Sequence, residues 1–318
     1  MRKAILFLAK AAVSGLLLYF ALNWVSIGTV VNRISRIDLH WVVFVLIIML
    51  AQQILLTLRW QKILIQCGGE FSFPRLFRFN MIGAFFTQTL PSSVGGDAVR
   101  LWLVAKQTNW RIAGYSVLLD RVIGVAALAI FVVASLPWSL GLIHNAVGRS
   151  ALLVLGLGSL AGGIVFVGSP WSRLRLFRRW PVTRHFAAVA AVGATIVRSP
   201  SSFPLLLGLS IFVHLLSVVM AWSLARSVDA HLPFQYALLL IPPVILVTVF
   251  PISIAGWGVR EGAMVAAFAY AGLAQSDGLI VSLLFGLSSL LIGAVGGVIW
   301  IFQIERAGRT QIAAQAND

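Results

Sequence analysis

Six apolar stretches in this chain are each long enough to cross the hydrocarbon core of a lipid bilayer. An α-helix rises about 1.5 Å per residue, so roughly 20 apolar residues cover a core about 30 Å thick. The stretches cover approximately residues 4–25, 40–58, 113–137, 150–168, 203–225 and 278–302. The sequence is 60% hydrophobic and 10% charged, which is typical of a polytopic membrane domain rather than a soluble one. We therefore predict an all-α polytopic integral membrane protein with a single domain over residues 1–318.

Two further apolar regions, residues 79–105 and 236–273, are each interrupted in the middle by the same ten-residue frame. The first copy begins at Pro91 and reads PSSVGGDAVR; the second begins at Pro251, 160 residues later, and reads PISIAGWGVR. Serine, glycine, valine and arginine recur at matching places in the two copies. Interrupted hydrophobic segments at corresponding positions of two halves are the best sequence indication of a substrate site near the membrane midplane.

Each frame predicts two short helical arms joined by a tight turn. Proline ends the incoming arm because it lacks an amide hydrogen and disfavours helix in the residue before it, and glycine permits the turn. The structural turn residues are Pro91, Gly95 and Gly96 in the first copy, and Pro251, Gly256 and Gly258 in the second. The first incoming arm, residues 80–90, is about 16 Å long as a helix, too short to span. We therefore predict two re-entrant broken-helix hairpins, and an additional break at Pro242-Pro243 in the second region.

Arginine and lysine predict which ends of the crossings face the cytoplasm. Arg2 and Lys3 place the amino terminus there, and Arg59 and Lys62 are expected in a cytoplasmic connection before the first broken region. The basic loop 173–184 and the carboxyl terminus fall on the same side. Each half, about 1–145 and 146–310, then holds three crossings and one hairpin, so the second half is inverted relative to the first. Segment 183–198 is expected to lie along the cytoplasmic interface.

The two frames also carry the candidate chemistry. The outgoing arms begin near the midplane, so their positive helix ends point into a protein-enclosed cavity, which suits an anion such as phosphate. Arginine adds bidentate donors there, and serine can cap an outgoing arm. The candidate substrate-binding residues are Arg100, Arg260, Arg121, Asp97, Asp120, Glu261, Ser93 and Ser253.

The same charges allow a purely structural alternative, in which each arginine pairs with a neighbouring carboxylate. A charge at the membrane centre costs about 2.5–3.5 kcal/mol on insertion scales, so charges kept only for structure would be expensive. We favour a binding role, with Asp97 and Glu261 either balancing charge or taking up protons at release. Isolated polar residues are interpreted instead as interhelix hydrogen-bond partners. These residues are Gln52, Gln53, Asn80, Gln88 and His214.

Charge and cysteine content exclude several other classes. The formal net charge of +15 lies in short segments between apolar runs, so it indicates cytoplasmic loops rather than a nucleic-acid interface. The single cysteine, Cys67, excludes a disulfide framework and a thiolate metal site, and we expect no metal and no cofactor. Lys10 interrupts the first apolar run and no clean cleavage site follows, which favours a retained first helix over a signal peptide.

Three blocks of the sequence resemble the flippase-like membrane domain of lysylphosphatidylglycerol synthases, which also occurs as stand-alone proteins. They read LPSSVGGDAVR from Leu90, LDRVIG from Leu119 and PISIAGWGVREG from Pro251, and the resemblance covers nearly the whole chain. The family more often has Glu-Arg in the middle block, so Asp120 keeps the charge with a shorter reach. The polar core that the resemblance implies comprises Pro91, Gly95, Gly96, Asp97, Arg100, Asp120, Arg121, Pro251, Gly256, Gly258, Arg260 and Glu261.

The resemblance implies a lipid flippase of the prokaryotic cytoplasmic (inner) membrane, multi-pass, with both termini cytoplasmic. Its substrate would be a membrane lipid with a polar, phosphate-bearing headgroup. Bifunctional synthases carry a cytoplasmic aminoacyl-transferase domain, whereas only residues 305–318 follow the last crossing here, so we do not expect an enzyme. Two alternatives remain open: a non-transporting partner of a lipid- or glycan-biosynthesis enzyme, and an intramembrane lipid-phosphate enzyme using Ser92, Ser93 or His214. The headgroup and the oligomeric state also remain open.

Overall fold

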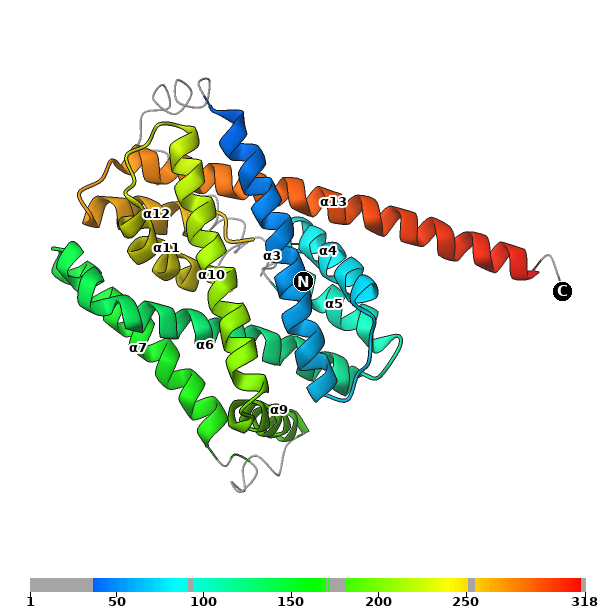
Figure 1. Ribbon diagram of the computed structural model, residues 1–318. Helices are drawn as coiled ribbons and strands as arrows, with labels where there is room; N and C mark the ends of the chain where they lie inside the picture. Colours follow the sequence, from blue (N-terminus) through cyan, green and yellow to red (C-terminus); the bar gives the residue numbers. More distant parts are fainter. Residues whose placement is uncertain (1–36, 91–93, 170, 172–180, 251–254, 316–318) are drawn as a thin grey trace, which may run out of the picture.

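The structure is a computed structural model that describes residues 37–90, 94–169, 171, 181–250 and 255–315, and these residues form helices and no β-strand (Figure 1). Five helices are long and apolar enough to cross a membrane. They are α3 (Leu39–Gln66), α6 (Trp110–Leu142), α7 (Ala146–Gly168), α10 (Ser202–Ser227) and α13 (Gln275–Gln315, apolar to Gln303). Each contains one of the predicted stretches, and the first predicted stretch, 4–25, lies outside the described residues. The protein is an all-α polytopic membrane protein, as predicted.

Four short helices flank the two frames. They are α4 (Phe73–Thr89) and α5 (Gly95–Ala105) around the first, and α11 (Phe234–Thr248) and α12 (Val259–Tyr270) around the second. The turn residues 91–93 and 251–254 lie outside the described residues. The additional break predicted at Pro242-Pro243 is wrong, because α11 continues through both prolines. Neighbouring helices and local adjustments can satisfy the backbone groups that a proline frees within a membrane helix.

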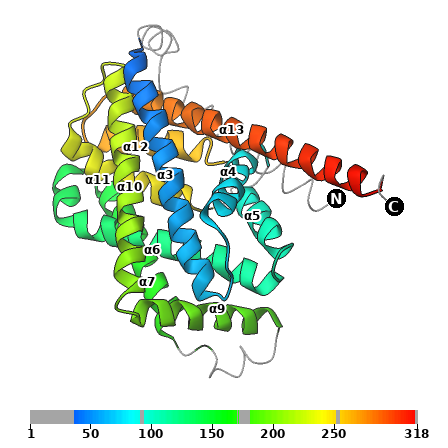
Figure 2. The same ribbon diagram turned by 45° about the vertical axis from the view of Figure 1, so that its right-hand side comes forward.

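Helices α3 and α10 pack side by side and run in opposite directions (Figures 1 and 2). The amide of Asp38, before α3, donates to the carbonyl of Ser227 at the end of α10, over 2.8 Å. Midway, Gln52 Nε2 donates to the carbonyl of Val213 over 2.9 Å. Gln66 Nε2 donates to Ser202 Oγ over 3.4 Å near the opposite end, so the two helices are in contact along their length.

Six other helices pack in two similar sets. In one set α4 packs on α5, and α5 on α6; in the other α11 packs on α12, and α12 on α13. The sets also exchange contacts, because α4 lies against α13 and α11 lies against α6. Consequently the two pairs of short helices are each enclosed by long helices from both halves of the chain.

A further helix, α9 (Pro181–Arg198), lies across the ends of α7 and α10 (Figure 2). It confirms that the predicted segment 183–198 is helical. Its apolar face is buried against α6, α7 and α10, whereas Arg184 and Arg198 are exposed. The buried side chains are Ala187, Val189, Ala190, Ala194 and Ile196. This two-sided character is typical of a helix at a membrane interface.

Candidate functional site

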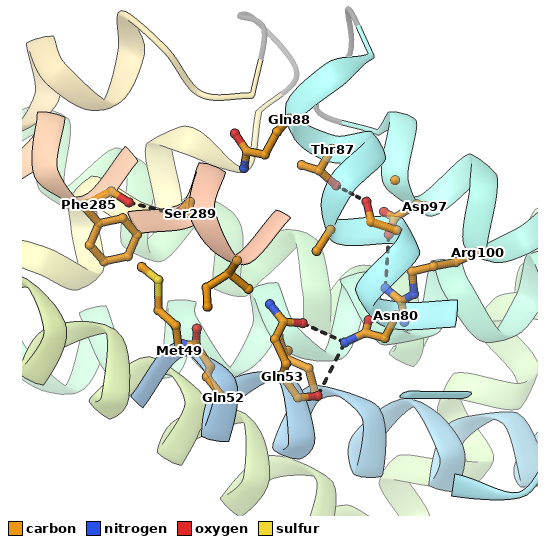
Figure 3. Close-up of a pocket in the computed structure, with 15 residues that line it drawn as sticks. Met49, Gln52, Gln53, Asn80, Thr87, Gln88, Asp97, Arg100, Phe285 and Ser289 are labelled. Carbon is orange, nitrogen blue, oxygen red and sulfur yellow. Dashed lines mark hydrogen bonds and ion pairs between the residues drawn. The ribbon is translucent and has the colours of Figure 1, made fainter. Parts of the chain in front are cut away.

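The first polar cavity lies where α3, α4, α5 and α13 meet, and has a volume of about 240 Å³ (Figure 3). Asp97 and Arg100 reach it from α5, and carboxamide side chains reach it from α3 and α4 (Figure 3). The polar residues that line it are Gln52, Gln53, Asn80, Thr87, Gln88, Asp97, Arg100 and Ser289. Charged and amide groups thus converge on one space between the helices of an otherwise apolar protein.

The second polar cavity adjoins the first and has a volume of about 350 Å³. The two cavities share Gln52, Thr87 and Phe285 in their walls. Arg121 reaches the second cavity from α6, in the first half of the chain, and Arg260 reaches it from α12, in the second half. Two of the predicted arginines, 139 positions apart in the sequence, therefore line one cavity.

The ends of both short-helix pairs lie at this second cavity. Thr87, in the last turn of α4, and Thr248, the last residue of α11, both line it. Gly96 lies against Thr87 so closely that an added Cβ would overlap the threonine hydroxyl and the Gly83 carbonyl. Gly256, the matching glycine of the second frame, lies against Thr248. Gly96 lines the first polar cavity and Gly256 lines the second, so the equivalent glycines of the two frames lie at adjoining cavities.

Five charged side chains form a continuous chain at the first frame. Arg59 Nε lies 2.8 Å from Asp120 Oδ1, and Arg100 Nη2 lies 3.1 Å from the other oxygen of the same carboxylate. Arg100 Nη1 is 3.2 Å from Asp97 Oδ1, and Asp97 Oδ2 pairs with Arg121. Arginine and aspartate alternate, with three positive charges and two negative ones. The pairing that the structural alternative required is present, and one net positive charge remains.

Arg100 occupies the middle of this chain and is almost completely buried. The face of the Trp60 ring lies 4.0 Å from its Cζ, so an aromatic surface covers one side of the guanidinium. Both terminal nitrogens are paired, whereas Nε is buried and has no hydrogen-bond partner among the described residues. Arginine presents five N–H donors. Arg100 Nε is therefore a donor that lies covered by the protein rather than open to the first polar cavity.

At the second frame Arg260 pairs with the carboxylate that follows it in the sequence. Arg260 Nη2 lies 2.7 Å from Glu261 Oε1, and Arg260 Nε donates to Ser282 Oγ on α13 over 3.1 Å. The amide of Gly258 donates to Glu261 Oε2 over 2.6 Å, so this buried carboxylate caps the start of α12. The sequence interpretation left the amides at this helix end free for a substrate; the structure places Glu261 there instead.

The predicted site residues fall into three groups in the structure. One cluster comprises Asp97, Arg100, Asp120 and Arg121. A second comprises Arg260 and Glu261. Arg121 and Arg260, one from each cluster, both line the second polar cavity. The predicted residues Pro91, Ser93, Pro251 and Ser253 lie outside the described residues. Of the turn glycines, Gly95 begins α5, whereas Gly256 and Gly258 both have a φ of +83°, a conformation that favours glycine.

Sequence reasoning missed Arg59, which it assigned to a cytoplasmic connection. The structure places Arg59 inside α3, buried, where it contacts Asp120 on α6 and donates to Ser210 Oγ on α10 over 3.2 Å. One signal could have identified it: the apolar residues Trp60, Ile63 and Leu64 follow Arg59 at helical spacing, so the apolar face of the helix continues past it. An arginine on such a face is expected to have a partner inside the protein.

Four of the five isolated polar residues make interhelix contacts, as predicted, whereas Gln88 lines the first polar cavity. Gln52 Nε2 donates to Ser217 Oγ on α10 over 2.8 Å, and Asn80 Nδ2 donates to Gln53 Oε1 on α3 over the same distance. His214 Nε2 lies 3.0 Å from the carbonyl of Gly124 on α6. Gln52, Gln53 and Asn80 also line the first polar cavity, a role that the sequence did not indicate. Among the described residues no three His, Cys, Asp or Glu side chains are grouped to hold a metal ion.

Comparison with known proteins adds one match. A protein-family model described as the lysylphosphatidylglycerol synthase TM region matches residues 7–297, which include both frames and every residue that lines the two polar cavities. No curated protein matches the chain.

Proposed function

The chain belongs to the family of the lysylphosphatidylglycerol synthase TM region, and from this premise we propose that it moves a phosphate-bearing lipid between the two membrane leaflets. It is a multi-pass membrane protein of a family named for lipid modification. The proposal places the headgroup in the two polar cavities while the hydrocarbon chains stay in the apolar phase. The protein would act in the cytoplasmic membrane of a prokaryote, with both termini in the cytoplasm, and would not be an enzyme.

One observation carries this proposal: Arg121 and Arg260, from the two halves of the chain, line the same cavity. Arginine binds phosphate through two parallel N–H bonds. These charge-assisted bonds are stronger than the bonds between neutral groups that an uncharged cavity wall could provide. A cavity of about 350 Å³ lies in the size range of small-molecule sites. A headgroup phosphate can therefore contact both halves at once.

The two short-helix pairs would be re-entrant hairpins that enter from opposite faces of the membrane. Two observations support an inverted repeat of residues 1–145 and 146–310. The equivalent helices α3 and α10 run antiparallel, and the packing of α4, α5 and α6 recurs in α11, α12 and α13. Inverted repeats allow a transporter to rock one half against the other around a central site. The headgroup would change sides during that motion.

The carboxylates would compete with the headgroup for the arginines. Asp97 pairs with both Arg100 and Arg121, and Glu261 pairs with Arg260. These pairs keep the arginines ordered and offset the cost of burying their charge. An arriving phosphate would replace a carboxylate as the partner of an arginine, and the carboxylate would recover the arginine when the lipid leaves.

The proposal is tested by separating the binding role of Arg260 from its structural role. Arg260→Gln alone leaves Glu261 buried without its charged partner, whereas Arg260→Gln/Glu261→Gln removes both charges and keeps an acceptor for the Gly258 amide. Translocation of labelled phosphatidylglycerol is measured in proteoliposomes. We expect the double variant to fold and to translocate at least about tenfold more slowly than wild type. Arg184→Gln, an exposed arginine on α9, is the matched control and should behave as wild type.

Two results would overturn the proposal. Wild-type rates in the double variant would show that Arg260 only balances Glu261. Failure of the wild-type protein to translocate any phosphate-bearing lipid, with correct folding shown by its helicity, would reject the transport function itself.

A further inference from the structure

An apolar groove lies on the side of the molecule between α6 and α7. It has a volume of about 520 Å³, and Phe250, just after α11, also lines it. Val122, Val125 and Ala126 of α6 form one wall, and Gly158 and Gly162 of α7 form the other. We call this space the lateral groove. Both of its walls belong to helices long and apolar enough to cross a membrane, so it faces the bilayer.

The lateral groove begins where the second polar cavity ends. Arg121 lines both spaces: it shares the second polar cavity with Thr248 and Arg260, and the lateral groove with apolar residues of α6 and α7. About a third of its side chain is exposed. Arg121 therefore stands at the junction of a polar, positively charged cavity and an apolar groove.

The apolar path continues along α7 beyond the lateral groove. A neighbouring cavity of about 440 Å³ shares Val154 and Leu155 with it, and α11 and α12 complete that cavity. Its walls are almost entirely aliphatic, with Tyr270 as an exception. Together, the second polar cavity, the lateral groove and this apolar cavity form one polar space with a long apolar extension that opens toward lipid.

We propose that the lateral groove holds a hydrocarbon chain of the substrate while Arg121 and Arg260 hold its phosphate. This inference rests on the proposed function and narrows the substrate to amphiphiles with a long chain, rather than free phosphate esters. Two neighbouring features indicate what the groove holds. The second polar cavity, with its arginines, favours an anionic headgroup, and the apolar groove that meets this cavity at Arg121 favours the hydrocarbon chain attached to that headgroup. A headgroup without a chain would leave this groove unused.

Two glycines of α7 allow the groove to be filled without disturbing the fold. A Cβ added at Gly158 or Gly162 would meet nothing within 4 Å, so a large side chain can enter the groove. Gly208, on α10, is the matched control, because it is also exposed with nothing within 4 Å and lines none of the cavities above. The variants Gly158→Phe, Gly162→Phe and Gly208→Phe are compared in proteoliposomes with labelled phosphatidylglycerol, and in detergent for binding of water-soluble glycerol phosphate.

We expect Gly158→Phe and Gly162→Phe to lower phosphatidylglycerol translocation by about tenfold or more, because the phenylalanine side chain would displace the hydrocarbon chain of the lipid from the apolar groove. Binding of glycerol phosphate should equal that of the wild type in all three variants, and Gly208→Phe should translocate as wild type does. If both groove variants translocate the long-chain lipid at the wild-type rate, the groove does not hold a chain. If they lose glycerol phosphate binding as well, the effect arises in the polar cavity, which also overturns the inference.

The alternative occupant is a second copy of the chain. Native mass spectrometry of the wild type and of Gly158→Phe decides this point, and a dimer that the substitution converts to a monomer would identify the groove as a subunit interface. These outcomes are distinct from failure of the proposed function, in which the wild-type protein itself moves no lipid.

Discussion

Arg59 connects three helices at one buried point, because its guanidinium contacts Asp120 on α6 and Ser210 on α10. Arg59→Gln removes the positive charge and leaves Asp120 with Arg100 as its remaining charged partner. Removing one partner of a buried ion pair costs about 3–5 kcal/mol, because an incompletely compensated charge stays buried. We expect a clearly lower melting temperature for the purified protein in detergent, followed by tryptophan fluorescence.

Lys62→Gln provides the control for that substitution. Lys62 lies three residues later on the same helix and is exposed, so the same loss of one positive charge leaves no buried partner behind. Its melting temperature should equal that of the wild type. A wild-type melting temperature for Arg59→Gln would contradict the structural importance of the five-residue charge chain.

The single cysteine gives a pH-dependent prediction. Burial raises the pKa of the Cys67 thiol to about 11, from an ordinary value near 9. Because the thiolate is the reactive form, the folded protein at pH 8 should react with maleimide about a hundredfold more slowly than the protein denatured in SDS. The rate in the folded protein should still rise about tenfold per pH unit between pH 8 and pH 10. Equal rates in the folded and denatured protein at pH 8 would show that Cys67 is not protected.

At the scale of single residues, the sequence predicted the charged residues that form the two clusters, with the exception of Arg59. The frames are recognisable because two copies can be compared position by position. Arg59 has no such counterpart, and counting charges in loops cannot show whether an arginine at the end of an apolar run points to water or inward. Its direction is decided by Asp120, 61 residues later in the sequence.

Helix α13 depends on close contact with α4, and Gly296 makes that contact possible. A Cβ added there would overlap the carbonyl of Met81 on α4, and backbone cannot move aside as a flexible side chain can. Gly296→Val should therefore push α13 away from α4 and destabilise the protein by about 1–3 kcal/mol. The melting temperature in detergent measures this, and Gly208→Val, with open space around it, should change little. Equal melting temperatures for the two variants would show that α4 and α13 can separate without cost.

The presence of these helices could be predicted from the sequence. The residues at which they begin and end, and whether a proline interrupts them, could not. Hydropathy locates the part of a helix that crosses lipid, so it predicted 113–137 within α6, which runs from Trp110 to Leu142. The start of α6 is set instead by Asn109, whose side chain accepts from the amides of Arg111 and Ile112. The continuation of α11 through Pro242 depends on its neighbours in the bundle, which a local sequence window cannot show.

At the scale of the whole molecule, the repeat indicated which segments are equivalent but not which ones touch. The structure adds that α4 packs on α13, and α11 on α6, so each half encloses part of the other. This exchange brings Arg121 and Arg260 to one cavity. No local sequence pattern contains that information, because the contacts join residues far apart in the chain. They depend on how the set of α4, α5 and α6 packs against the set of α11, α12 and α13.

The inverted arrangement makes a prediction about the two sides of the membrane. The α4–α5 pair and the α11–α12 pair would enter from opposite faces, so the connection after α5 and the connection after α12 would lie on opposite sides. Thr108 and Ala274 are exposed residues in those two connections. In a Cys67→Ser background, we expect a membrane-impermeant maleimide to label Ala274→Cys in intact spheroplasts, and Thr108→Cys only after permeabilisation. Labelling of both variants after denaturation confirms that each was present. If intact spheroplasts expose both cysteines, or neither, the two hairpins enter from the same face, and a headgroup held between Arg121 and Arg260 would have no route from one leaflet to the other.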